Sequence, residues 1–280
     1  MPHTLLLATD LGHRSDRALD RAAALARAWR ARLLVVHALK APGSPEDAPS
    51  WRRIGDPVAL ARRRIHRDLG VTDDLALEVI VERGDPGSVI AALAARHQVD
   101  LILSGVARDE TLGRLLLGST VEALLKQLPA PLLVVKRRPH GDYRHLVVAS
   151  DFTPGSKLAG DTALAWWPNA QVDLFHAFAL PFEGLLQDKR PTIERARQRA
   201  AEECQRFAAE STGGRYATTY CEHGEPAALL GDLVEARDVD LVIVGTEGRK
   251  GLAGMVLGSV AQRVLDRVPV DVLVVPRAGS

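Results

Sequence analysis

The sequence lacks several features that would place it in a class at once. It has two cysteines, Cys204 and Cys221, both in the second half. A chain of this length in a reducing compartment needs no disulfide, so free thiols are expected. No apolar run approaches the roughly 20 residues that span a bilayer. Met1-Pro2-His3 leads straight into a strand-like LLLATD, without a signal-peptide pattern, so we expect a cytoplasmic protein that does not insert into membranes.

The chain also lacks a charge of one sign. Its formal net charge is +1, which gives no general attraction to nucleic acid or acidic lipid. Apolar residues make up 46% and charged residues 25%, the profile of a globular protein. At 280 residues the chain is long enough for two domains.

The commonest catalytic motifs are missing. The sequence contains no G-x4-G-K-[ST] phosphate loop, no G-x-S-x-G elbow, no C-x2-C pair and no H-E-x2-H. Cys221 and His223 would share one face of a strand, but two ligands are too few for a metal site. His37 and His176 both end the second strand of their half, which favours packing or a hydrogen bond at the rim over catalysis.

What the chain does contain is a tandem duplication. Residues 99–108 (VDLILSGVAR) return at an offset of 140 as residues 239–248 (VDLVIVGTEG), and Gly118-Ser119 returns as Gly258-Ser259. A constant offset over such different residue types indicates one ancestral domain repeated. We expect domains at 1–139 and 140–280, joined near Arg138–Tyr143, where Pro139 and Gly141 lie.

Each half alternates short apolar strands with helical patterns, which predicts an α/β fold with a mostly parallel sheet and helices on both faces. The first half has predicted strands at Thr4–Thr9, Arg32–His37, Leu77–Glu82, Asp100–Ser104 and Leu132–Lys136, and helices at Ser15–Trp29, Pro57–Asp68, Pro86–His97 and Ser119–Leu128. The second has strands at His145–Ser150, Val172–His176, Ala217–Glu222, Asp240–Val244 and Val272–Val275, and helices at Ser156–Trp166, Thr192–Glu210, Pro226–Arg237 and Ser259–Arg267.

A candidate anion site follows the fourth strand of the second half. Gly245 and Gly248 let backbone amides approach a phosphate closely. After nine intervening residues, Gly258-Ser259 opens a helix whose free amides and dipole favour an anion, and Ser259 with Gln262 fits a capping box. The spacing predicts one loop that leaves the sheet and returns, so that both elements face one polyphosphate.

Asp151 ends the first strand of the second half, at the same edge of the sheet. A carboxylate there is well placed to hold a metal or a ribose. Taken singly, the glycines, the Gly-Ser helix start and Asp151 are all explained by turns and caps. Their order and spacing together favour binding.

The pattern G-x2-G-x9-G-S behind an aspartate of the first strand resembles the ATP-binding motif of universal stress proteins. The exits from the third strands, ERGDP at residues 82–86 and EHGEP at 222–226, and the closing P-x-x-x-L-V-V runs ending at Val135 and Val275 resemble that family too. The resemblance covers essentially the whole chain, and the duplication is similar to the family's tandem class.

This resemblance implies two Rossmann-like domains of the adenine nucleotide α-hydrolase type, each with a five-stranded parallel sheet of order 3-2-1-4-5. It implies binding of ATP, or another adenine nucleotide, with magnesium. The two halves would pack through their last strands as an intramolecular counterpart of the family's dimer, and whole chains can pair further. By analogy the implied site residues are as follows: Gly245 for the ribose, Gly248, Gly258, Ser259 and the Val260 amide for the phosphates, Asp151 for the nucleotide or its metal, and the backbone of Ala177, after strand two, for adenine.

The first half departs from the motif. It keeps Asp10, Gly105, Gly118 and Ser119, but Arg108 stands where the second half has Gly248. A side chain there either fills the phosphate space or offers a different anion contact. Ser119 and Glu122 still fit a capping box, so a preserved helix start without a ligand explains them as well.

The leading hypothesis is a nucleotide-responsive stress regulator without catalytic residues, whose ATP hydrolysis is at most slow and whose protein partner is unknown. One alternative is an enzyme of the related superfold that uses ATP to adenylate a substrate. Its S-G-G-x-D-S or H-x-G-H signature is missing, because the matching stretches are TDLG at 9–12 and SDFT at 150–153. Another alternative is a scaffold with a vestigial site, which recruits a partner or lipid through aromatic side chains of the second half.

Overall fold

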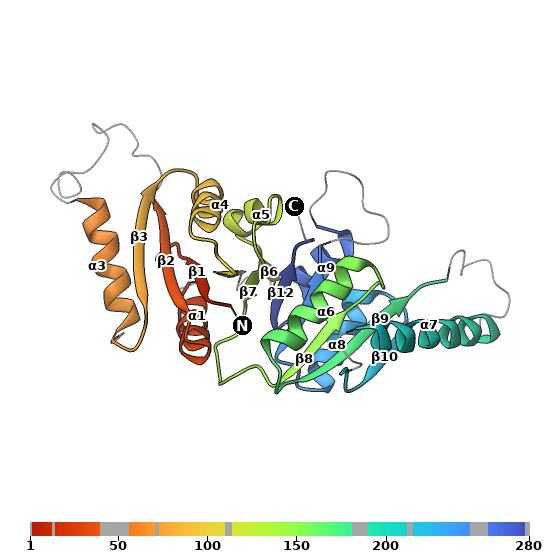
Figure 1. The fold of residues 1–280 in the computed structure, drawn as a ribbon. Helices are drawn as coiled ribbons and strands as arrows, with labels where there is room; N and C mark the ends of the chain where they lie inside the picture. The colour runs from red at the N-terminus through yellow and green to blue at the C-terminus, as the bar shows by residue number, and fades with distance from the viewer. Residues whose placement is uncertain are drawn as a thin grey trace. The chain divides into compact units, whose positions relative to one another are not determined.

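The computed structural model describes the chain except for residues 1, 13–14, 40–55, 71–72, 110–113, 181–189, 212–214, 247–256 and 278–280, and at 107–109 and 114–116 it describes the backbone alone. It separates into two compact units, Met1–Gly141 and Asp142–Ser280. Figure 1 shows both units as layers of helix and sheet.

The first domain holds a parallel sheet in which β1 pairs with β2 and β4, β2 with β3, and β4 with β7. The strand order is therefore third, second, first, fourth, fifth, as expected. Its elements are β1 (Thr4–Ala8), α1 (Asp16–Trp29), β2 (Arg32–Leu39), α3 (Pro57–Leu69), β3 (Leu77–Arg83), α4 (Pro86–Arg96), β4 (Leu101–Gly105), β5 (Ala107–Asp109), β6 (Arg114–Leu116), α5 (Ser119–Leu125) and β7 (Leu132–Val135).

The second domain repeats this topology, with β8 paired to β9 and β11, β9 to β10, and β11 to β12. Its elements are β8 (His145–Ala149), α6 (Pro154–Trp166), β9 (Gln171–Phe178), α7 (Arg190–Glu210), β10 (Thr219–His223), α8 (Pro226–Ala236), β11 (Leu241–Gly245), α9 (Ser259–Arg267) and β12 (Asp271–Val275).

Right-handed crossovers place the helices on both faces of each sheet. In the second domain α6 and α7 cover one face, while α8 and α9 pack together on the other (Figure 1). The central strands are buried on both faces, which explains their unbroken apolar runs: Leu241–Val244 of β11 and all of β12 are buried. None of the helices in the described parts of the chain is long and apolar enough to cross a membrane.

The first domain contains a hairpin that the sequence analysis did not predict. β5 and β6 run antiparallel, with Arg108 opposite Leu115. Each strand has only three residues, which is too short for the alternation of apolar and polar residues that indicates a strand. Arg108 thus lies in a paired strand at the position that corresponds to Gly248.

The expectation of free thiols is wrong. Cys204 of α7 and Cys221 of β10 form a disulfide between residues 17 positions apart. The two elements are consecutive and α7 packs on β10, so the fold itself brings the sulfur atoms together. Neither spacing nor composition shows that proximity.

Two buried carboxylates lie near the amino ends of strands in the second domain's sheet. Asp173 of β9 has no exposed surface and lies 2.8 Å from His145 Nε2. Asp271 of β12, 1% exposed, accepts a hydrogen bond from the Tyr143 hydroxyl. The Tyr143 ring also packs edge-on against Trp167. A buried carboxylate requires such donors, because an unsatisfied one is costly.

Replacing Tyr143 by phenylalanine should lower the free energy of unfolding by about 1–3 kcal/mol, because the ring contact stays while buried Asp271 loses a donor. Chemical denaturation followed by circular dichroism measures this. Tyr220→Phe is the matched control: no hydrogen bond of its hydroxyl is seen among the described residues, and it should cost under about 0.5 kcal/mol. Equal costs for both variants would contradict the role of the Tyr143 hydroxyl.

Candidate functional site

The candidate site lies at the carboxyl edge of the second domain's sheet, where β8 and β11 end side by side. Ala149 is the register partner of Val244, so the turn after β8 and the residues after β11 leave the sheet at the same level. Thr246 follows β11 directly, and its N–H still donates to the Val275 carbonyl at 3.1 Å. Open α/β sheets bind ligands at this edge.

The chain returns to this point after the loop that follows β11. The Gly258 N–H donates to the Thr246 carbonyl at 2.9 Å, which closes the loop at its base. The helix that starts at Ser259 therefore begins next to the end of β11. This agrees with the predicted loop that leaves the sheet and returns, although Gly248 itself lies outside the described residues.

The predicted capping box at α9 is wrong. Gly258 is the N-cap, Ser259 is the first helical residue, and within the described chain no side chain caps this helix. Gln262 turns to Asp266 instead. A serine at the first helical position cannot accept a hydrogen bond from the amide that an N-cap serine would reach. The position of Ser259 in the helix, and not its residue type, therefore decides whether it caps. The same holds for α5, whose N-cap is Gly118 and not Ser119.

The start of α9 differs from that of four other described helices. Four described helices have proline in the first turn and an Asp, Thr or Glu side chain that caps the backbone: α3, α4, α6 and α8. Helix α9 keeps an N–H donor at its first position and has no such cap, and Ser259 and Val260 are exposed. First-turn amides without intrahelical partners, at the positive end of the dipole, form an anion site.

Asp151 lies in the turn after β8 and is half-buried. Its Oδ1 accepts hydrogen bonds from the Thr153 hydroxyl at 2.6 Å and the Thr153 N–H at 3.2 Å. Thr153 in turn is the N-cap of α6 and accepts from Ser156 N–H. Phe152 between them has a left-handed φ of 64°. The turn therefore orients Asp151 through contacts that the sequence analysis did not name.

Gly245 has a structural reason to be glycine. A Cβ at this position would lie 2.8 Å from the backbone carbon and oxygen of Gly155, at the start of α6. Helix α6 thus approaches β11 more closely than any side chain allows. This contact explains the glycine independently of a ribose.

Ala177 lies inside β9, in register with Glu222 of β10, and not after the strand as expected. Phe175 accepts a hydrogen bond from Ser150 N–H on the β8 side, and backbone groups two residues apart face the same side. The N–H and C=O of Ala177 therefore face the side on which β8 has already ended.

The two strand-two histidines hold the turns at this edge. His176 Nδ1 donates to the Ser150 carbonyl and His37 Nδ1 to the Thr9 carbonyl, each at 2.8 Å. The prediction of a rim hydrogen bond is confirmed. The bond also sets the tautomer, because a carbonyl can only accept.

Glu225 connects α9 to the neighbouring helix. It caps α8 through the Ala228 N–H at 2.8 Å and pairs with Arg263 and Arg267 of α9 at 3.1 and 3.3 Å. Burial acts to raise the pKa of its carboxyl, but the amides and both arginines outweigh this and lower the pKa. The carboxylate contacts are therefore present at neutral pH and are lost as the pH falls through that lowered pKa.

The first domain repeats the turn but not the whole site. Asp10 accepts from Gly12 N–H and the Ser15 hydroxyl, and Leu11 has a φ of 60°, as Phe152 does. Its helix α5 has seven residues and an uncapped glycine start like that of α9. The loop differs, because Arg108 lies in the β5–β6 hairpin.

The structure thus brings Asp151, Gly245, Gly258, Ser259 and Val260 to one edge of one domain. Thr246 and Thr153, which hold the two halves of the site in place, were missed, although a polar residue directly after a buried strand is a usable signal. No group of three or more His, Cys, Asp or Glu side chains suited to a metal is found among the described residues.

Two Rossmann-like α/β domains, each with a glycine-started helix at the carboxyl edge of a parallel sheet, define a tandem α/β protein. The chain belongs to the universal stress protein family, whose sequence model matches residues 1–136 and again 142–276.

Relatives and solved structures agree with this. The chain is 28% identical to a universal stress protein of Mycolicibacterium smegmatis over 228 residues, 78% of this chain and 75% of that protein. It is 29% identical to one from Mycobacterium tuberculosis over 287 residues, 90% and 92% of the two chains. The crystal structure of a universal stress protein from Archaeoglobus fulgidus superposes with a TM-score of 0.68 at 19% identity, covering 98% of each chain, which shows the fold.

Replacing Gly245 by alanine should destabilise the second domain by about 1–3 kcal/mol, because the new Cβ overlaps the Gly155 backbone. Thermal unfolding measures it. Gly231→Ala in α8 is the control, since nothing lies within 4 Å of its Cβ position. That variant should gain about 0.5–1 kcal/mol from the helix propensity of alanine. A neutral Gly245→Ala would show that α6 does not approach β11 as closely as described.

Proposed function

We propose that this protein binds ATP, or another adenine nucleotide, in its second domain and acts as a nucleotide-responsive regulator in the stress response. The observation that carries the proposal is the start of α9. A helix whose first amides have no cap among the described residues begins beside the end of β11, held there by the bond from Gly258 to Thr246. This is the arrangement that a phosphate chain requires.

The ligand's parts are assigned in the order of the motif. The phosphates lie against Gly248, Gly258, Ser259 and the Val260 amide, and the ribose lies near Gly245. The adenine ring meets the backbone of Ala177. The direction of that backbone, toward the side where β8 has ended, supports the last assignment.

Magnesium fits this site only as an ion carried by the nucleotide. Mg²⁺ bound with a triphosphate needs one or two carboxylates, its remaining ligands being phosphate oxygens and water. Asp151 is the carboxylate that the turn after β8 supplies. When bound, the ion neutralises phosphate charge, and the role of Asp151 is to orient it.

Binding without catalysis is part of this proposal. Among the described side chains at this edge, the Asp151 carboxylate accepts from Thr153 and the Ser150 hydroxyl donates to Ser156. A site that binds without a nucleophile or base matched to the phosphates supports a sensor, in which hydrolysis is slow at most. Action in the cytoplasm through an unidentified protein partner belongs to this proposal.

Substituting Ser259 by proline tests the amides directly. Gly258 has φ −67° and ψ 151°, the conformation preferred before proline, and the first helical position accepts proline readily. The variant should keep its stability within about 0.5 kcal/mol. It should lose about 10–100-fold in ATP affinity, since a hydrogen bond to a charged phosphate contributes about 1.5–3 kcal/mol. Isothermal titration calorimetry with ATP and Mg²⁺ measures the affinity.

Two controls interpret that result. Ser259→Ala removes the hydroxyl and keeps the amide, so it separates the two contributions. Ser119→Pro makes the same change at the start of α5 in the first domain. An unchanged affinity in Ser259→Pro would remove the amide from the site.

Gly248→Arg places in the second domain the residue that the first domain has at Arg108. Because a long side chain fills the space of the phosphates, ATP retained through purification should fall below about a tenth of the wild-type amount. Nucleotide released by acid and quantified by chromatography measures it. Arg108→Gly is the reciprocal change. Equal ATP content in wild type and Gly248→Arg would contradict the assignment of this loop.

A further inference from the structure

The disulfide joins a helix to an edge strand of the second domain. Cys204 of α7 is fully buried, while Cys221 of β10 is half-buried. Strand β10 is the third strand of the domain's sheet and pairs with β9 on one side. The bond therefore fixes α7 to this face of the sheet at a point where one of the two cysteines is partly exposed.

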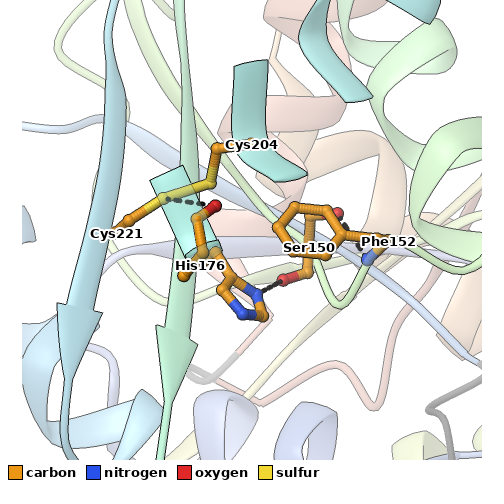
Figure 2. Close-up of a disulfide and its surroundings, with 6 residues drawn as sticks. Ser150, Phe152, His176, Cys204 and Cys221 are labelled. Atoms are coloured by element: carbon orange, nitrogen blue, oxygen red, sulfur yellow. Dashed lines mark hydrogen bonds between the residues drawn. A yellow bond between two sulfur atoms is a disulfide. The ribbon is translucent and has the colours of Figure 1, made fainter. Parts of the chain in front are cut away.

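Cys221 lies close to the turn that holds Asp151. Its register partner on β9 is His176. The His176 imidazole donates to the Ser150 carbonyl at 2.8 Å, and its ring centroid lies 4.2 Å from that of Phe152. Figure 2 shows the disulfide and these rings on the same side of the sheet.

Helix α7 reaches the same turn by a second route. Phe207, 8% exposed and three residues after Cys204, has its ring centroid 5.5 Å from that of Phe152. Phe152 is therefore held between His176 of the sheet and Phe207 of the helix, and the disulfide fixes the spacing of these two elements. Phe152 directly follows Asp151, so any movement of α7 acts on the candidate site.

The first domain shows that the fold does not need this bond. Val81 of β3 is in register with His37, as Cys221 is with His176. In α3 the buried pair Ala61 and Ile65 has the spacing of Ala200 and Cys204 in α7. Ile65 and Val81 therefore correspond to Cys204 and Cys221, and the turn around Leu11 forms without a disulfide.

The reduced form has a hydrogen-bond acceptor ready. Cys221 Sγ lies 3.5 Å from the Ala200 carbonyl oxygen on α7. A disulfide sulfur carries no hydrogen, so this contact becomes a hydrogen bond only when Cys221 is a thiol. Both redox states are therefore compatible with a folded domain.

We propose that Cys204 and Cys221 form a reversible thiol–disulfide couple that sets how firmly α7 holds the turn at residues 150–153, and with it the affinity of the neighbouring site. The effect on ligand rests on the proposed nucleotide function. The effect on the turn does not.

The reductant is a dithiol. Its thiolate attacks the accessible Cys221 sulfur, the bond between the cysteines breaks, and Cys204 leaves as a thiolate that takes up a proton. The second thiol of the reductant then attacks the mixed disulfide and releases Cys221. Two electrons and two protons pass to the protein, and the dithiol becomes a disulfide. Without the cross-link α7 is held to β10 by non-covalent contacts alone, among them the ion pair between Arg197 and Glu222, so Phe207 restrains Phe152 less.

The test uses the whole chain, either oxidised in a glutathione buffer or reduced with dithiothreitol. Alkylation and intact mass should show no free thiol in the first state and two in the second. Hydrogen exchange of the peptide that contains residues 150–153 should be faster after reduction. ATP affinity should fall by about fivefold, the lower end of typical coupling between sites.

Two variants separate the cross-link from its transmission. Cys204→Ile with Cys221→Val installs the first domain's apolar pair, and dithiothreitol should then change neither exchange nor affinity. Phe207→Leu keeps the cysteines and removes the ring that contacts Phe152. This variant should still cycle between thiols and disulfide, but the exchange of residues 150–153 should no longer follow.

The outcomes are distinct. Failure of the thiols to pair in the glutathione buffer overturns the inference, and so does a wild-type chain that cycles while exchange at residues 150–153 stays constant. If exchange follows the redox state but neither form binds ATP, the inference holds and the proposed function fails.

Discussion

The whole site depends on one backbone hydrogen bond, from the Gly258 N–H to the Thr246 carbonyl. It closes the loop after β11 at its base and thereby places the start of α9 beside the end of a buried strand. The bond needs no particular side chain, but residue 258 must be extended for α9 to begin at Ser259. Glu225 then holds α9 from the other side through two arginines. Rigid strands, a closed loop and an anchored helix together keep the first-turn amides in a fixed direction.

The described helices of this fold begin in two different ways. Four of the described helices have a proline in the first turn and a side-chain cap that accepts a hydrogen bond from a first-turn N–H. The first-turn amides of α9 have no such cap among the described residues. The local sequence therefore leaves this helix start without a cap of its own at the edge where β8 and β11 end. Such a departure from local optimisation is expected at functional sites.

The strand order was implied by the resemblance to universal stress proteins, whereas the sequence pattern itself predicted the fold class and most element ends to within two residues. It succeeded because parallel strands buried on both faces are apolar throughout, and because Pro86, Pro226 and the Gly-Ser pairs mark helix starts clearly. It failed where the outcome depends on dihedral angles or on contacts between elements. Ser259 fits a capping box by spacing, but the backbone makes Gly258 the cap. The left-handed Phe152 and the pairing of Cys204 with Cys221 follow from packing that no pattern of residues reveals.

The β5–β6 hairpin of the first domain has a consequence for dose response. In that half the segment after the fourth strand is paired backbone to backbone, with Arg108 opposite Leu115. One half of the chain thus retains the complete glycine motif and the other does not. A symmetric pair of identical subunits offers two equivalent sites that can cooperate, whereas this chain carries unequal ones. For the nucleotide site proposed above, this difference implies that occupancy follows a simple hyperbola with a stoichiometry of one, which is a graded response without a threshold.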